Sequence, residues 1–340
     1  MRMSTTQYRL TMAVLFFLVI LTALVALGIG RFSLSIFESL EILWSGVFRG
    51  QEAVTNQRGF SVIFNIRIPR ILVAMLVGAG LATSGAAFQA LFSNPLATAD
   101  TLGVTAGASF GACLGLLLNF NMILVQSLAL CIGLLAMLMI SFLGKKNGRM
   151  NIIMMILSGI VVSSLFQAFL SLIRYVADPE NDLPGITFWL MGSFSSASYN
   201  MLLIGAPFIL IGIFVLYTIR WKLNLLALPE DEASSLGIDV QKMRIIVIVS
   251  AACITAASVS ISGQVGWVSL LIPLIARMIF GVNNQRLIPA CIGMGAIFMV
   301  IIDTLARAAT SAEIPLSILT AIVGAPVFIF LLRRTGGIWV

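Results

Sequence analysis

A few charged residues near the ends of apolar runs could recognise a partner. Arg67 and Arg70 flank Pro69, which fixes the local backbone. Arg307 follows Asp303 by four residues, so these two side chains share a helix face and can pair. We expect the three arginines to form a basic rim that receives acidic groups of a docking partner. Interfacial snorkelling and neutralisation by Asp303 are the structural alternatives.

A second candidate lies in a polar loop, where the sequence reads LPEDEASSLG (228–237). Proline and acids at the start and glycine at the end are typical of a short helix. We expect an amphipathic helix parallel to the membrane. Such a helix could dock a cytoplasmic partner, and an ordinary solvated loop is the alternative. The residues that would contact the partner are Pro229, Glu230, Glu232, Ala233, Leu236 and Gly237.

Other kinds of chemistry find little support. There is no histidine, so imidazole catalysis and histidine metal ligation are excluded. The four cysteines lie in apolar runs without metal-ligand spacing, and we expect them to be small buried residues. Gly144-Lys145 lacks the other residues of a phosphate-binding loop. We therefore predict no catalytic residue, no metal site and no nucleotide site in this chain.

Glycine recurs at every fourth position over one apolar stretch, at Gly103, Gly107, Gly111 and Gly115. On a helix these residues form one smooth stripe, which lets a neighbouring membrane helix approach closely. Helix packing is therefore the favoured interpretation, and lining of a transport pathway is the alternative.

The elements that carry these residues are membrane helices. The chain has 340 residues, of which 60% are hydrophobic and 10% charged, and its mean hydropathy is +1.08. A soluble domain has about 25% charged residues. We predict an all-α membrane protein with about ten transmembrane helices in one bundle, a single domain over residues 1–340. The expected spans are 10–30, 70–90, 101–118, 123–143, 151–173, 198–219, 244–262, 267–281, 287–306 and 314–332.

The basic residues set the orientation. Most of the 20 lysines and arginines fall on the side of the N-terminus, so both termini are predicted to be cytoplasmic. This distribution explains the net charge of +7 without nucleic acid. The polar segments are then an outer loop (31–69), a cytoplasmic loop (220–243) and a short outer helix near 184–194. The first apolar run is long enough to be retained as a span.

Several stretches resemble the FecCD-type permeases of ABC importers, which carry iron–siderophore complexes, haem or cobalamin. The similar segments are IRIPRILVAMLVGAGLATSGAAFQALFSNPLATADTLGVTAGASFGA (66–112), FWLMGSFSSASY (188–199), LALPEDEASSLGID (226–239), ISGQVGWVSLLIPLIARM (261–278) and DTLARAATSAEIPLSILTAIVGAPVFIFLLRR (303–334). Their order and spacing match the family over nearly the whole chain.

The resemblance implies a set of partners. These are a second permease subunit, with a homodimer expected, two cytoplasmic ATPase subunits that use ATP and Mg²⁺, and one extracytoplasmic substrate-binding protein, all at the cytoplasmic (inner) membrane of a bacterium or archaeon. It also implies that Arg67, Arg70 and Arg307 receive acidic residues of the binding protein. Residues 229–237 match the segment that couples the permease to the ATPase. The fifth, eighth and tenth spans, together with the short helix after the fifth, match the pathway side of the family.

Two positions depart from the family pattern. Many members have histidine where this chain has Leu274, so a role tied to that imidazole is absent here. The start of the fifth span, at Asn151-Ile152-Ile153-Met154, is more apolar than the family's cytoplasmic gate. We therefore assign no gate residues from the resemblance.

The sequence thus predicts a permease subunit of an ABC importer that takes up a metal chelate, with ferric siderophore first. Haem, cobalamin or an oxyanion are the alternatives within this class. An ion-coupled transporter is a weaker alternative, because Asp100 and Asp303 are the only acids near spans and both lie close to span ends. A membrane enzyme would need a nucleophile–base set that the sequence lacks, and a structural subunit would leave the 228–237 motif unexplained.

Overall fold

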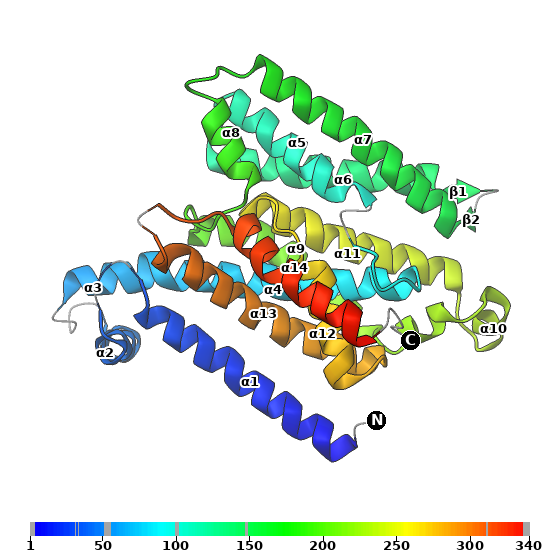
Figure 1. Cartoon of the computed structure of the whole chain (residues 1–340), viewed down its shortest axis with the longest axis horizontal. Coiled ribbons are helices and arrows are strands. Elements are labelled where there is room, and N and C mark those ends of the chain that lie inside the picture. The colour runs from blue at the N-terminus through cyan, green and yellow to red at the C-terminus, as the bar shows by residue number, and fades with distance from the viewer. Residues whose placement is uncertain are drawn as a thin grey trace.

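The computed structural model describes residues 4–30, 32, 34–50, 56–98, 102–146, 149–310 and 312–335, and Asp100 lies outside them. These residues form a helical bundle with one two-stranded hairpin (Figure 1). The α-helices are α1 (Thr5–Gly28), α2 (Ile36–Phe48), α3 (Gln57–Ser61), α4 (Ile68–Leu91), α5 (Val104–Leu117), α6 (Met122–Leu143), α7 (Ile152–Val176), α8 (Leu183–Leu190), α9 (Tyr199–Thr218), α10 (Glu230–Ser235), α11 (Val240–Ser262), α12 (Val268–Phe280), α13 (Asn284–Ala308) and α14 (Leu316–Thr335). The hairpin pairs β1 (Lys145–Lys146) with β2 (Arg149–Met150), and a 3₁₀ helix covers Lys222–Ala227.

The predicted membrane spans are confirmed. Eight of the described helices are long and apolar enough to cross a membrane, and the shorter apolar helices α5 and α12 lie at the positions of the other two predicted spans. α1 begins and α14 ends at the same end of the bundle (Figure 1). Following the distribution of basic residues, we call this the cytoplasmic end and the opposite one the outer end.

The second span begins earlier than the sequence predicts. A single helical rod runs for 35 residues from Gln57 to Leu91, and a π-helical turn at Val62–Arg67 joins α3 to α4. Much of the predicted outer loop 31–69 is therefore helical. Ser35 starts α2 with a capping box that includes Glu38, and Asn56 caps α3 by accepting the Gly59 N–H. Apolar periodicity alone did not reveal these polar helix starts.

α4 lies at the centre of the bundle. In the most apolar stretch of the Gln57–Leu91 rod, which ends in α4, 83% of the residues are buried. The corresponding share in α1 is 11%. A Cβ atom at Gly78 would overlap the carbonyl oxygen of Gly295 on α13, and one at Gly85 would overlap that of Ser269 on α12. Backbones therefore meet directly at both crossings, which is the close approach that small residues allow in membranes.

The other helices surround α4 in two groups. α13 and α1 lie along one side of α4, and α5, α6, α7 and α8 form the opposite side of the molecule (Figure 1). α11 lies between the groups and packs against α4, α5, α6 and α9. The structure therefore joins two helix packets through α11.

Two of the spanning helices cover only part of the membrane. α5 has 14 residues and α12 has 13, so each is about 20 Å long at ~1.5 Å per residue. The hydrocarbon core is about 30 Å thick. Non-helical segments precede both helices, and irregular backbone at this depth must face protein or a water-filled cavity. The space between α5 and α12 is therefore the first place to look for a pathway.

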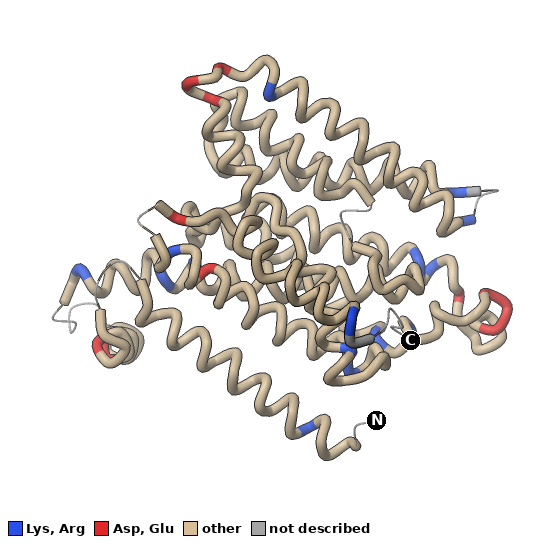
Figure 2. Tube along the Cα trace, viewed as in Figure 1, with Lys and Arg blue, Asp and Glu red and all other residues tan. Residues whose placement is uncertain are grey.

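Charged residues gather at the two ends of the bundle and are sparse in its middle (Figure 2). The cysteines follow the prediction only in part. Cys113 and Cys291 are buried and Cys253 is partly buried, but Cys131 is exposed on α6. An apolar run in a membrane helix has an outer face as well as a buried one, so position in the run does not decide burial.

Candidate functional site

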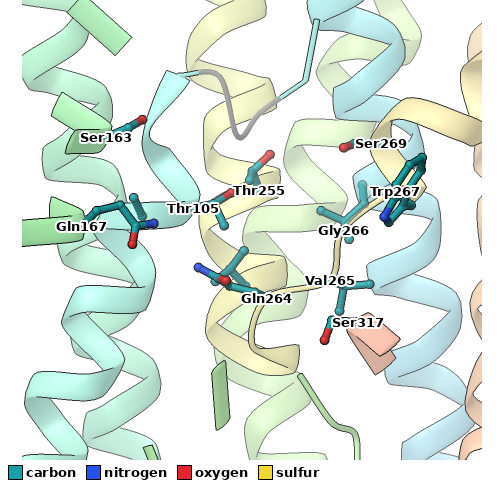
Figure 3. A pocket seen from close by; sticks show the side chains of 13 residues that line it. Thr105, Ser163, Gln167, Thr255, Gln264, Val265, Gly266, Trp267, Ser269 and Ser317 are labelled. Atoms are coloured by element: carbon teal, nitrogen blue, oxygen red, sulfur yellow. The ribbon is translucent and has the colours of Figure 1, made fainter. Parts of the chain in front are cut away.

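A cavity of about 330 Å³ lies between the two helix packets. Figure 3 shows residues of α7 on one side, the segment Gln264–Trp267 on the other, and Thr105 and Thr255 between them. No charged side chain is found among its described lining residues, which are Leu81, Thr105, Ala106, Ser163, Gln167, Thr255, Val259, Gln264, Val265, Gly266, Trp267, Ser269 and Ser317. The wall is thus neutral, with hydroxyl and amide groups set among apolar ones.

The extended segment between α11 and α12 forms one wall of this cavity. Gly263 and Gly192 have positive φ angles of 70° and 75°, and a Cβ at either residue would meet backbone of the other segment. Gln264 donates from Nε2 to Ser109 Oγ on α5 over 2.8 Å. Trp267 packs edge-on against Phe328 of α14, with ring centroids 6.2 Å apart. These contacts fix the amide of Gln264 at the cavity.

The chain around α8 connects this wall to α14. The predicted short outer helix near 184–194 corresponds to α8. Beyond it, the Ser193 N–H donates to the Ser262 carbonyl over 2.9 Å. The Leu316 N–H donates to the Gly192 carbonyl over 2.9 Å, and Ser317 to Met191 over 3.1 Å. The ends of α8 and α11 and the start of α14 therefore form one hydrogen-bonded joint.

The glycine stripe packs helices together. Cβ atoms at Gly107, Gly111 and Gly115 would each press on α6, at Ala136, Leu128 and Val125 respectively. Gly103 has a different role, because its φ of 69° places it in the left-handed region just before α5. Its Cα faces Ser163 of α7, whose buried Oγ has no hydrogen-bond partner among the described residues and lines the cavity.

The predicted basic rim is a buried ion-pair cluster. Arg67, Arg70 and Arg307 are 3%, 6% and 6% exposed. Arg70 makes a salt bridge to Asp303 at 2.8 Å and a two-pronged one to Glu313 at 2.8 and 2.9 Å. In this conformation carboxylates and nearby carbonyl groups surround the guanidinium groups, as the alternative of neutralisation by Asp303 expects, and docking of a partner at these arginines stays a prediction.

The remaining contacts in the cluster come from α1 and the chain after it. Arg67 donates to the carbonyl of Leu27 and, over 2.7 Å, to that of Phe32. Arg307 donates to the Ala26 carbonyl and lies 3.6 Å from Asp303, as the spacing of four predicted. A second cavity, of about 190 Å³, opens on all three arginines and on Glu313. The sequence pattern did not reveal the pairing of Glu313 with Arg70.

The predicted cytoplasmic helix is α10, and its two faces differ. Ala233 is buried, whereas Pro229, Glu232, Leu236 and Gly237 are exposed. Glu230 accepts from Gln241 Nε2 at 3.1 Å and from Arg244 Nη1 at 3.0 Å, which attaches α10 to the start of α11. The Gln241 hydrogen bond and the Arg244 charge hold the pKa of Glu230 below its ordinary value. The exposed set forms a surface open to a partner.

The positions that depart from the family pattern have structural roles. Leu274 is fully buried with Leu271 and Leu331, and Asn151 caps α7 by accepting the Met154 N–H. Within the described residues, no group of three or more histidine, cysteine or acidic residues is placed to hold a metal ion. The cavity residues Gln264 and Ser317 were not singled out from the sequence. The two glycines around Gln264 and Val265 were the available signal.

Comparison with known families agrees with this architecture. The family model of the FecCD transport family matches residues 17–334. The chain belongs to this family. It is the permease subunit of an ABC importer, a multi-pass protein of the inner membrane. A permease of this kind works with ATPase and substrate-binding subunits.

FecCD relatives of different specificity are similar over most of their length. The molybdate import permease MolB of Haemophilus influenzae is 40% identical, over 94% of this chain and 95% of its own. The hemin transport permease HmuU of Yersinia pestis is 33% identical over 96% of both. A solved inward-facing metal-chelate type ABC transporter superposes with a TM-score of 0.86 at 38% identity, covering 95% of this chain and 99% of that one.

Proposed function

We propose that two copies of this chain form the membrane pathway of an ABC importer for a metal-containing solute, and that the 330 Å³ cavity is part of that pathway. The observation that carries the proposal is the neutral, hydroxyl- and amide-lined wall built on irregular backbone at membrane depth. Such a wall offers hydrogen bonds without fixed charge, so a polar solute can pass without being held tightly. Two ATPase subunits and one binding protein complete the proposed assembly.

Within this class, we place a metal oxyanion such as molybdate first. It is supported by the 40% identity to MolB over nearly the full length of both chains. The hydroxyl and amide donors of the cavity suit an oxyanion. A ferric siderophore is the second candidate. It is supported by a probable iron chelatin permease of Helicobacter pylori, 35% identical over 82% of this chain.

Uptake into vesicles tests both the importer assembly and the identity of its substrate. The tagged chain is purified in mild detergent with its co-purifying subunits, reconstituted, and supplied with binding protein, ATP and either radiolabelled molybdate or a ferric siderophore. We expect ATP-dependent uptake that excess unlabelled molybdate abolishes. Uptake of the siderophore alone would reverse the order of the substrates. A chain that purifies alone, without ATPase activity in several detergents, would contradict the importer assembly.

We also propose that Arg67, Arg70 and Arg307 receive carboxylates of the binding protein, by exchange. Glu313 already holds Arg70 with both oxygens, so an arriving carboxylate would replace an internal one. Removing the charge in Glu313→Gln should then tighten docking several-fold and make it more sensitive to salt. The matched control is Glu180→Gln, an exposed acid of the outer α7–α8 connection. Equal affinity of the wild-type and Glu313→Gln permeases for the binding protein would contradict the proposed exchange of carboxylates.

A further inference from the structure

A groove of about 450 Å³ lies on the periphery of the bundle, between α1, α4, α9 and α13. All its described lining residues are apolar. α1 packs along α13, where Gly293 faces the side chain of Leu15, and it makes fewer contacts with α4. The space that remains beside α1 therefore has α4 as its floor and faces the hydrocarbon of the membrane.

The cytoplasmic end of this groove is aromatic and basic. Tyr8 lies one turn before Met12, a lining residue of α1, and Tyr217 lies one turn beyond Ile213 on α9. Arg286 lies one turn before Pro289 on α13. Residues three or four apart share a helix face, so all three continue the walls of the groove.

The arginines at this end are close to the tyrosines. The Arg286 guanidinium lies 5.3 Å from the centre of the Tyr8 ring, and the Arg220 guanidinium lies 4.0 Å from that of Tyr217. Tyr8 is near enough to Arg220 and Arg286 to interact with both electrostatically. The Nε atom of Arg220 is buried and has no hydrogen-bond partner among the described residues. The Nη1 atom of Arg220 donates to the Tyr217 carbonyl over 2.5 Å, which holds this guanidinium beside the tyrosine.

An asparagine contact joins the two chain segments that carry these arginines. Asn224, in the 3₁₀ helix just after Arg220, donates from Nδ2 to Asn283 Oδ1 over 3.0 Å. The Asn284 N–H donates to Asn224 Oδ1 over 2.8 Å. These bonds join the chain that carries Arg220 to the start of α13, which carries Arg286.

The apolar lining of the groove lies at the middle depth of the bundle. On α1 the lining extends from Met12 to Val19, seven residues or about 10 Å at ~1.5 Å per residue, and on α4 it extends from Leu72 to Ala79, in the outer half of that helix. Half of the hydrocarbon core is about 15 Å. The eleven residues from Tyr8 to Val19 add up to about 17 Å, so an acyl chain whose headgroup lies beside Tyr8 reaches along the apolar lining.

We propose that this groove and its basic end bind one anionic phospholipid of the cytoplasmic leaflet. An acyl chain fills the apolar groove, and the phosphate lies between Arg220 and Arg286 at the level of the two tyrosine rings. Basic pockets between membrane helices on the cytoplasmic side recognise such headgroups, and tyrosines anchor at the interface. This site is separate from the pathway cavity and does not depend on the transported substrate.

The test compares two lipids on the delipidated full-length protein with its co-purifying subunits. Dioleoylphosphatidylglycerol and dioleoylphosphatidylcholine are titrated separately, and bound lipid is counted by native mass spectrometry while Tm is recorded. We expect phosphatidylglycerol to bind more tightly and to raise Tm more than phosphatidylcholine does. Equal binding and equal Tm shifts for the two lipids in the wild-type protein would overturn the proposal without any variant.

Two kinds of variant separate the headgroup from the chain. Arg220→Gln with Arg286→Gln should weaken phosphatidylglycerol binding about thirtyfold, at ~1 kcal/mol for each basic side chain, and leave phosphatidylcholine binding unchanged. The control is Lys242→Gln, an exposed cytoplasmic charge on α11. Ile213→Trp fills the groove and should weaken both lipids. A double variant that keeps the phosphatidylglycerol preference would contradict the assignment of the arginines. If glycerol phosphate raised Tm as much as phosphatidylglycerol does, the site would bind a soluble anion and not a lipid.

Discussion

Gly85 is the point where α4 and α12 come into backbone contact, because a Cβ there would overlap the Ser269 carbonyl oxygen. Gly85→Ala must push the two helices apart. We expect it to lower stability by about 3 kcal/mol, at the upper end of the usual cost of overpacking. Gly185→Ala, in α8, is the matched control, since a Cβ there meets nothing within 4 Å. Thermal unfolding in one detergent compares the two, and equal Tm values would refute the crossing.

The buried acid Asp303 is shared by two arginines. It lies 2.8 Å from Arg70 and 3.6 Å from Arg307, and it is 1% exposed. Removing one partner of a buried charge pair leaves the other uncompensated, which costs roughly 3–5 kcal/mol. Asp303→Asn should therefore lower Tm strongly, whereas Glu180→Gln at the exposed outer surface should change it little. A normal Tm for Asp303→Asn would show that the cluster is open to water.

Among the secondary-structure elements, α10 has one side attached to the bundle and one side exposed to a partner. Glu232 on α10 and Leu236 directly after it are exposed, and Leu236 is 61% exposed. Glu232→Lys with Leu236→Asp should lower transport per ATP hydrolysed at least several-fold and leave Tm unchanged. Arg9→Gln, at the start of α1, is the control. Unchanged coupling in the double variant would exclude α10 from the ATPase contact.

The attachment of α10 to α11 should depend on pH. The pKa of the Glu230 carboxyl is lowered by Gln241 and Arg244, so the charged form is favoured in the folded protein. The stabilisation is then fully present above the unfolded-state pKa of about 4.3 and is lost as the pH falls through the lower folded value. Hydrogen exchange of α10, corrected for intrinsic rates, should accelerate over this range. Glu230→Gln should remove the pH dependence.

Patterns within one element were predictable from the sequence, and contacts between elements were not. The ten spans follow from apolar runs that no soluble domain would carry, and the pair Asp303–Arg307 follows from a spacing of four. Arg70 and Glu313 are 243 residues apart, so only the folded bundle reveals their salt bridge. The early start at Gln57 was hidden because a polar helix outside the hydrocarbon has no apolar signature.

At the scale of the whole molecule, the family could be predicted from the sequence, whereas the residues of the cavity could be identified only in the folded structure. The FecCD assignment rested on segments that keep their order along the chain, and the match over residues 17–334 confirms it. The cavity combines Ser163 of α7, Gln264 of the 263–267 segment and Ser317 of α14, which are far apart in sequence. No local pattern could have grouped them, since each residue type is common at membrane-helix interfaces.

The direct backbone contact between α4 and α13 at Gly78 and Gly295 makes these two helices a rigid pair, against which movements of the other helices can be measured. Backbone against backbone leaves no side chain to change rotamer, so the pair has only one arrangement. Spin labels on α4 and α13 should keep a constant separation through the ATP cycle. Labels on α7 and α14, which meet across a cavity, should not. A change in the α4–α13 distance would contradict this rigid pair, and would mean that the ATP-driven conformational change deforms the centre of the bundle.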